Sequence, residues 1–123
     1  MNNGIKIADV ITLHSSGEDL IIGADEFDLM KESVILVNSA RGGIVNESDL
    51  YDALTKNKIR GAGLDVFEAE PPDNSPLLEM ENVVITPHTA GSTIDTWWRR
   101  LDFAFDNITR VSRGEKPLFV VDD

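Results

Sequence analysis

The stretch from Val34 to Gly43 constrains the fold of this chain more than any other. Four apolar residues, Val34 to Val37, lead into Asn38-Ser39-Ala40-Arg41-Gly42-Gly43. Continuous apolar runs of this kind are typical of strands in parallel sheets, which are buried on both faces. Glycines after such a strand let the backbone turn sharply and approach a ligand closely. The planar, always charged guanidinium of Arg41 suits a carboxylate, so the stretch predicts a carboxylate site at a strand end.

Apolar runs and amphipathic segments alternate along the rest of the chain. The sequence predicts strands over residues 8–13, 34–37, 60–66 and 83–86. It predicts helices over 25–31, from an N-cap at Asn46, and from a cap at Ser92 or Thr93 to about residue 111. Pro71-Pro72 marks residues 67–74 as a loop. The alternation of strands and helices predicts an α/β fold with a parallel, helix-covered sheet and a long last helix.

Composition narrows the classes of function. The 123 residues suffice for one small domain. A net charge of −11 argues against nucleic acid and against anionic membrane surfaces as partners. The absence of cysteine excludes disulfides and thiolate metal sites, and His14 and His88 lack the His-x-x-x-His spacing of a metal site, so no metal is expected. No segment resembles a signal peptide or a membrane span, and a cytoplasmic location is expected.

Each predicted strand finishes on a polar or charged group. These groups are His14, Arg41, Asp65 and His88, and the loop after Asp65 adds Glu68 and Glu70. Ligands of open α/β sheets bind outside the carboxyl ends of the strands. An arginine for a carboxylate, a histidine as acid or base, and a carboxylate to orient the histidine suit the interconversion of 2-oxo and 2-hydroxy acids. A nicotinamide cofactor is the natural source of the hydride.

Four blocks of sequence, in the same order, resemble the D-isomer-specific 2-hydroxyacid dehydrogenases. They are residues 8–14, 37–43, 61–71 and 85–91. That family includes phosphoglycerate, glycerate/hydroxypyruvate, formate and D-lactate dehydrogenases. The resemblance implies the C-terminal half of a Rossmann-type, doubly wound NAD-binding domain. It also implies an NAD(P)-dependent oxidoreductase acting on the CH–OH group of a D-2-hydroxy acid.

The resemblance implies a role for individual residues. Arg41 matches the substrate-binding arginine, His88 the acid/base, and Glu70 the glutamate that pairs with it. Cofactor contacts are implied for His14, Ser15, Ser39, Ala40, Arg41, Asp65, His88, Ala90 and Gly91. The expected cofactor is NAD, with NADP as an open alternative, and the expected substrate in an intact enzyme is a small 2-oxo or 2-hydroxy acid.

The chain departs from the family in its phosphate-binding loop. No Gly-x-Gly-x-x-Gly motif is present, because Gly61-Ala62-Gly63 leads into a strand and Val66 stands where the third glycine would be. Residues 1–123 are therefore expected to form a partial NAD(P)-binding domain without most of the substrate domain. This chain alone is expected to bind the cofactor poorly and to be inactive. An open edge at the first strand and exposed aromatic residues on the last helix would favour a homodimer or self-association.

Several alternatives stay open at the level of sequence. The chain could be an inert fragment that binds no cofactor, or a non-catalytic NAD-binding or regulatory module, as the corepressor branch of the family suggests. A metal hydrolase built on His14, His88 and nearby carboxylates is a more distant alternative. His14 is explained equally well as a structural residue at a strand end.

Overall fold

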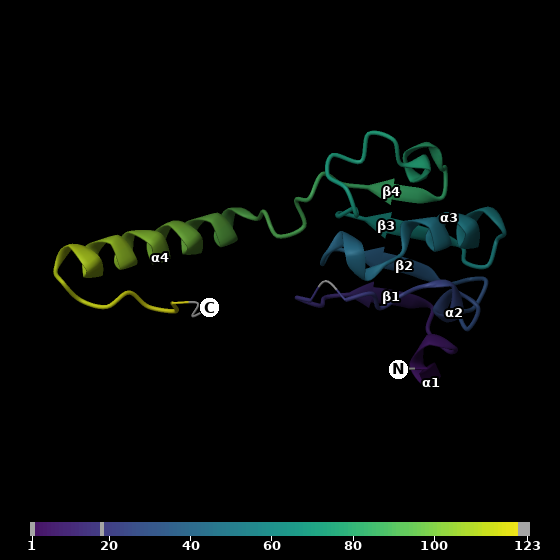
Figure 1. The fold of residues 1–123 in the computed structure, drawn as a ribbon, viewed down its shortest axis with the longest axis horizontal. Helices are drawn as coiled ribbons and strands as arrows, with labels where there is room; N and C mark the ends of the chain where they lie inside the picture. The colour runs from purple at the N-terminus through teal and green to yellow at the C-terminus, as the bar shows by residue number, and fades with distance from the viewer. Residues whose placement is uncertain (1, 18, 121–123) are drawn as a thin grey trace. The chain divides into compact units, whose positions relative to one another are not determined.

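Four parallel strands form one sheet in the order β1-β2-β3-β4 (Figure 1). The computed structural model describes residues 2–17 and 19–120, which divide into two compact units. We call residues 1–89 the sheet unit and residues 90–123 the helix unit. The strands are β1 (Val10–Leu13), β2 (Ile35–Asn38), β3 (Gly61–Leu64) and β4 (Val83–Ile85).

Short helices connect the strands of the sheet unit. They are α1 (Asn2–Ile5), α2 (Ala24–Phe27), η1 (Gly42–Ile44), α3 (Glu47–Thr55) and η2 (Pro76–Glu79). α2 and α3 lie on the same face of the sheet and contact each other, as expected where crossovers between parallel strands are right-handed (Figure 1). α3 begins where the Asn46 side chain accepts a hydrogen bond from the Asp49 amide at 2.9 Å.

The core lies between the sheet and these helices. Leu36 from β2, Leu50 and Leu54 from α3, and Phe27 from α2 are at most 2% exposed. Residues on the other face of the sheet are more exposed, because side chains alternate along a strand. We call this the open sheet face; its apolar members Val10, Ile35 and Val84 are 58%, 37% and 71% exposed.

The helix unit consists of α4 (Ile94–Ser112) and the segment that follows it. Thr93 caps α4 by accepting a hydrogen bond from the Thr96 amide. The segment after α4 folds back along it, since the Leu118 amide donates to Asn107 Oδ1 at 2.7 Å and the Phe119 ring lies 5.6 Å from that of Phe103.

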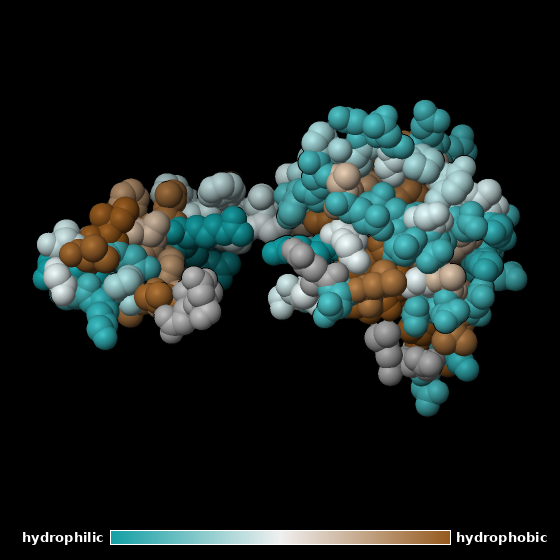
Figure 2. Space-filling view, viewed as in Figure 1, coloured by the Kyte–Doolittle hydropathy of each residue, from teal (hydrophilic) through white to brown (hydrophobic). Residues whose placement is uncertain are grey.

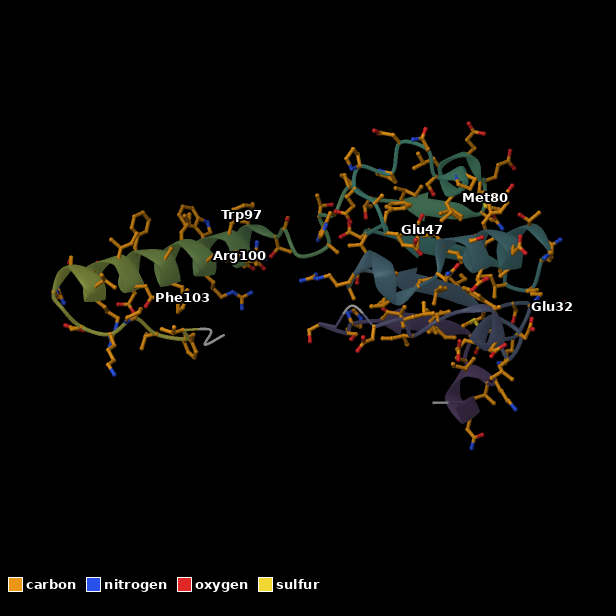
Figure 3. All side chains as sticks on the ribbon, viewed as in Figure 1. Glu32, Glu47, Met80, Trp97, Arg100 and Phe103 are labelled. Atoms are coloured by element: carbon orange, nitrogen blue, oxygen red, sulfur yellow. The ribbon has the colours of Figure 1, made fainter. Side chains whose placement is uncertain are left out.

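One side of α4 carries an apolar stripe with helical spacing (Figures 2 and 3). None of the residues of α4 is buried. Trp97 stacks with the guanidinium of Arg100, whose Cζ lies 5.8 Å from the ring centroid. We define the α4 stripe by its exposed members, Ile94, Trp97, Trp98, Leu101, Phe105 and Ile108.

The predicted order of strands and main helices is confirmed, with differences in length. Asn46 and Thr93 are the observed caps, and Ser92 is not. The strand predicted over 8–13 begins at Val10, and the helix predicted over 25–31 ends at Phe27 in a turn. The prediction missed α1 and η1, whose short segments contain glycine and have no apolar period. The predicted strand edge at β1 and the predicted exposure of the aromatic residues of α4 are also confirmed.

Within the described ranges, no helix has both the length and the apolar character that a membrane span requires.

Candidate active site

Because all four strands are parallel, their carboxyl ends meet at one edge of the sheet. Asp65 follows β3 directly, and the loop after it carries Glu70. Arg41 follows β2 by three residues, and His88 follows β4 by three residues. The loops at this edge therefore bring together side chains that are far apart in sequence.

The turn that carries Arg41 is held by the side chain of Asn38. Asn38 is 1% exposed, its Nδ2 donates to the Arg41 carbonyl at 2.8 Å, and its Oδ1 accepts from the Ala40 amide at 3.1 Å. The Arg41 side chain is exposed, and its Nη1 donates to the Ala40 carbonyl at 2.8 Å. The exposed, charged guanidinium of Arg41 is thus attached to a backbone that the buried Asn38 side chain holds in place.

The side chains of Glu70 and His88 lie within hydrogen-bond distance across 18 positions of sequence. Glu70 Oε2 lies 2.8 Å from His88 Nδ1, and Glu70 Oε1 accepts from the Phe67 amide at 3.1 Å. The hydrogen bond with His88, followed by that from the Phe67 amide, lowers the pKa of Glu70 from its ordinary value. A charged Glu70 on Nδ1 leaves the Nε2 atom of His88 for exchange of a proton with a ligand.

Asp65 holds the turn that carries His88. The Asp65 carbonyl accepts from the His88 amide at 2.9 Å, and its Oδ1 accepts from the Thr89 amide at 2.8 Å and from the Thr86 hydroxyl. His88 itself has a φ of 52°, in the left-handed region that non-glycine residues seldom adopt. Such backbone strain persists only where surrounding contacts enforce it, and it concentrates at functional sites.

The three predicted catalytic residues line one cavity of about 430 Å³. Arg41, Glu70 and His88 line it, together with Gly42, Gly43, Val66, Phe67 and Glu68. A second cavity, of about 340 Å³, lies on the Pro71-Pro72 side of Glu70 and His88 and has a mainly apolar lining. An arginine, a histidine and a carboxylate in one cavity can bind a carboxylate and move a proton on the same small molecule.

The other predicted cofactor residues lie in three different segments of the chain. His14 is exposed, and its Nε2 lies 2.9 Å from Thr12 Oγ1. Ser15 Oγ accepts from the Gly17 amide. Ser39 is half-buried and Ala40 buried, both in the Arg41 turn. Ala90 and Gly91 begin the helix unit. The cofactor contacts of all these residues stay a prediction.

Glu68 and Glu70 differ in their hydrogen-bond partners. The Glu68 side chain accepts from the Glu47 amide at 2.9 Å, and the Glu47 side chain accepts from the Glu68 amide at the start of α3 (Figure 3). Glu70 is the one of the two that contacts His88. Nowhere in residues 2–17 and 19–120 do three His, Asp or Glu side chains gather as a metal site requires.

Sequence reasoning missed two polar residues that organise the site. Asn38 was part of the stretch that defines the Arg41 turn, yet its buried amide was not singled out. Thr86 donates to Asp65 across 21 positions. The signal for Asn38 was a polar residue at the end of an apolar run, where a buried amide must find partners.

Residues 1–90 match a family model described as the NAD-binding domain of D-isomer-specific 2-hydroxyacid dehydrogenases. The D-3-phosphoglycerate dehydrogenase of Methanocaldococcus jannaschii is 45% identical over 118 residues, which are 94% of this chain and 22% of that protein. The glyoxylate reductase of Korarchaeum cryptofilum is 45% identical over 117 residues, which are 92% of this chain and 35% of that protein. The chain therefore spans about a fifth to a third of the length of these relatives.

Solved structures share the fold over the whole chain. A D-lactate dehydrogenase from Lactobacillus jensenii, crystallised with NAD+, superimposes with a TM-score of 0.90 at 32% identity, over 100% of this chain and 42% of that one. A 2-hydroxyacid dehydrogenase from Xanthobacter autotrophicus, in complex with NADPH and MES, gives 0.78 at 31% identity, over 98% of this chain and 51% of that one.

Proposed function

The chain belongs to the D-isomer-specific 2-hydroxyacid dehydrogenases, in the NAD-binding domain of that family, and from this premise we propose that it forms the catalytic edge of an NAD(P)-dependent oxidoreductase. The reaction would interconvert a small 2-oxo acid and the corresponding D-2-hydroxy acid. One observation carries the proposal: Arg41, Glu70 and His88 line a single cavity, in which Glu70 Oε2 lies 2.8 Å from His88 Nδ1.

The residues present fit one end of a nicotinamide cofactor. The buried carboxylate of Asp65 at the end of β3 offers acceptor atoms of the kind that a carboxamide can use. The sequence contains no Gly-x-Gly-x-x-Gly motif for the pyrophosphate. When bound, the nicotinamide supplies or accepts the hydride.

Arg41, Glu70 and His88 would divide the remaining chemistry. Arg41 binds the carboxylate of the 2-oxo acid and orients its carbonyl group. His88 would donate the proton on Nε2 to the carbonyl oxygen of the 2-oxo acid, which becomes the hydroxyl group of the 2-hydroxy acid. Glu70 would keep the imidazole ring oriented through its hydrogen bond with Nδ1. In the oxidative direction, His88 takes the proton back.

The test is NADH binding to the 123-residue chain by fluorescence or calorimetry, followed by an absorbance assay of NADH oxidation with glyoxylate or pyruvate. Because the sequence has no Gly-x-Gly-x-x-Gly motif for the pyrophosphate, we expect weak but saturable binding and at most a slow, substrate-dependent oxidation. Arg41→Gln should lower the oxidation rate about 10²-fold or more by removing the positioned charge. Arg60→Gln, an exposed arginine just before β3, is the matched control and should leave the rate unchanged.

Failure of NADH to bind at millimolar concentration would contradict the proposal for this chain. Such a result would favour the alternatives of an inert fragment or a module whose chemistry depends on further sequence.

We also propose that the chain self-associates, as a homodimer in the simplest case. The open sheet face, the edge of β1 and the α4 stripe are exposed apolar surfaces that a second copy could cover. Light scattering tests this proposal, and a monodisperse monomer would contradict it.

We further propose a cytoplasmic location, because reduced nicotinamide cofactors serve metabolism there. Cell fractionation tests this location.

A further inference from the structure

We propose that Asn38 is the positioning residue for Arg41, because its buried amide fixes the turn from which the guanidinium reaches a carboxylate. The inference rests on the proposed role of Arg41 in binding a substrate carboxylate. Asn38 does not itself line the cavity, and it would act through Arg41, which does.

The first observation is how the Asn38 amide is used. A buried amide side chain needs hydrogen-bond partners, and the partners of Asn38 both lie in the Arg41 turn. Nδ2 donates to the carbonyl of Arg41 itself, at 2.8 Å, and Oδ1 accepts from the amide of Ala40, at 3.1 Å. The Asn38 carbonyl, in turn, accepts from the Asp65 amide at 2.9 Å. One residue therefore ties the Arg41 turn to β2 and β2 to the start of the Asp65 loop.

The second observation is the close approach of Gly42 to the loop that follows β3. A Cβ added at Gly42 would overlap the Phe67 carbonyl and crowd the Glu68 amide. The same Phe67 residue donates its amide to Glu70, which bonds to His88. The backbone just after Arg41 thus packs against the segment that orients the Glu70–His88 pair.

The Arg41 side chain needs such support from its backbone. It is exposed, and the hydrogen bond recorded for it within the described ranges goes to the carbonyl of its neighbour, Ala40. The Arg41 backbone therefore sets the region near His88 that the guanidinium can reach. A displacement of about 1 Å in a substrate-positioning group can cost about 10²-fold in rate.

Asn82 provides a matched control. Its Nδ2 also donates to the carbonyl of an arginine, Arg60, at 3.4 Å, but it does so just before β4, away from the carboxyl ends of the strands. Asn38→Asp and Asn82→Asp are the same chemical change, from an amide donor to a carboxylate oxygen. The Asn38→Asp substitution keeps an acceptor for the Ala40 amide, but it places a negatively charged oxygen next to the Arg41 carbonyl oxygen.

The experiment measures ¹⁵N order parameters and pyruvate affinity on the full chain. In the parent and in Asn82→Asp, the Arg41 and Gly42 amides should have order parameters near the rigid value of about 0.85, and in Asn38→Asp these should fall below about 0.6. Pyruvate, followed through the Arg41 Nε–H resonance, should bind about tenfold more weakly or worse to Asn38→Asp, and unchanged to Asn82→Asp.

Each outcome decides one question. Rigid Arg41 and Gly42 amides in a folded Asn38→Asp protein, with unchanged pyruvate affinity, would overturn the role of Asn38. If the parent does not bind pyruvate, the proposed function fails, while the order parameters still test the positioning of the Arg41 backbone. If Asn38→Asp does not fold, the test is hydrogen exchange of the side-chain NH₂ groups in the unsubstituted chain. Slower exchange at Asn38 than at Asn82 supports the inference, and equal exchange rates overturn it.

Discussion

Two phenylalanines show how differently the two units hold their apolar side chains. Phe27 in the sheet unit is 1% exposed, whereas Phe105 in the helix unit is 64% exposed. The charges differ as well: residues 1–89 carry six Lys and Arg against 16 Asp and Glu, a net of −10, and residues 90–123 carry five against six, a net of −1. The sheet unit is stabilised by packing, and α4 by its caps and local sequence.

This difference bears on function because the predicted catalytic residues, Arg41, Glu70 and His88, all lie in the sheet unit. Their loops are attached to strands that share a buried core. α4 has no buried side chain, and so it lacks the tertiary packing that normally supplies most of the stability of a helix. The residues proposed for the chemistry thus lie in the unit that has a hydrophobic core.

The largest expected effect compares the same substitution in the two units. Phe27→Ala removes a fully buried ring, and it should lower the free energy of unfolding by about 3–5 kcal/mol through lost burial and a residual cavity. Phe105→Ala should change it by about 0.5 kcal/mol or less, as is usual for exposed positions. Urea denaturation followed by circular dichroism measures both.

Equal losses of unfolding free energy from Phe27→Ala and Phe105→Ala would contradict the difference between the two units. They would mean that Phe105 is buried in solution, against a second copy of the chain. Repeating the Phe105→Ala measurement at several protein concentrations separates the two cases, because stabilisation by association depends on concentration.

A smaller effect is expected at the cap of α4. Thr93→Ala removes the side chain that accepts from the Thr96 amide, and it should destabilise α4 by about 1 kcal/mol. Because α4 has no buried residue, the loss should appear as reduced helicity at an unchanged urea midpoint for the sheet unit. Circular dichroism at the helix minimum measures the loss, and tryptophan fluorescence reports on α4 through Trp97 and Trp98.

Thr109→Ala is the control for the cap, since Thr109 lies inside α4 and alanine is the better helix former. It should raise helicity slightly. If Thr93→Ala also shifted the midpoint of the sheet unit, the two units would unfold together and the contrast between them would be wrong.

Local sequence signals predicted the strands, the main helices and their caps well. Asn46 was identified from its position before Glu47 and Asp49, and the cap it forms is local. The end of the helix predicted over 25–31 was wrong because Met30 and Lys31 continue the amphipathic pattern, whereas the chain turns after Phe27. Periodicity indicates which face is apolar more reliably than where a helix ends.

Contacts between distant loops lay beyond the local signals. The resemblance implied that Glu70 pairs with His88, but the left-handed backbone of His88 and its clamp by Asp65 depend on how two loops meet. The inward amide of Asn38 likewise depends on the conformation of the turn after β2. Such features follow from tertiary packing, which propensity and period do not encode.

The smallest expected effect concerns the pH dependence of the sheet unit. Hydrogen bonds from His88 and from the Phe67 amide lower the pKa of Glu70 below its ordinary value of 4.5. The unfolded chain therefore binds a proton at a higher pH than the folded chain does, and stability rises with pH in the interval between the two pKa values. The contribution is fully present above pH 4.5 and is lost as the pH falls through the folded pKa.

Glu70→Gln should remove this part of the pH dependence, and Glu79→Gln, at an exposed position of η2, should leave it intact. Because Glu70 is 39% exposed, the difference between the parent and Glu70→Gln should be small, about 0.2–1 kcal/mol, as for other exposed pairs. Urea midpoints between about pH 6 and pH 3 measure it, and the Phe105→Ala protein should show the same pH dependence as the parent. Identical pH profiles for Glu70→Gln and the parent would mean that the Glu70–His88 bond does not persist in solution, and the orientation proposed for the acid/base would then lose its support.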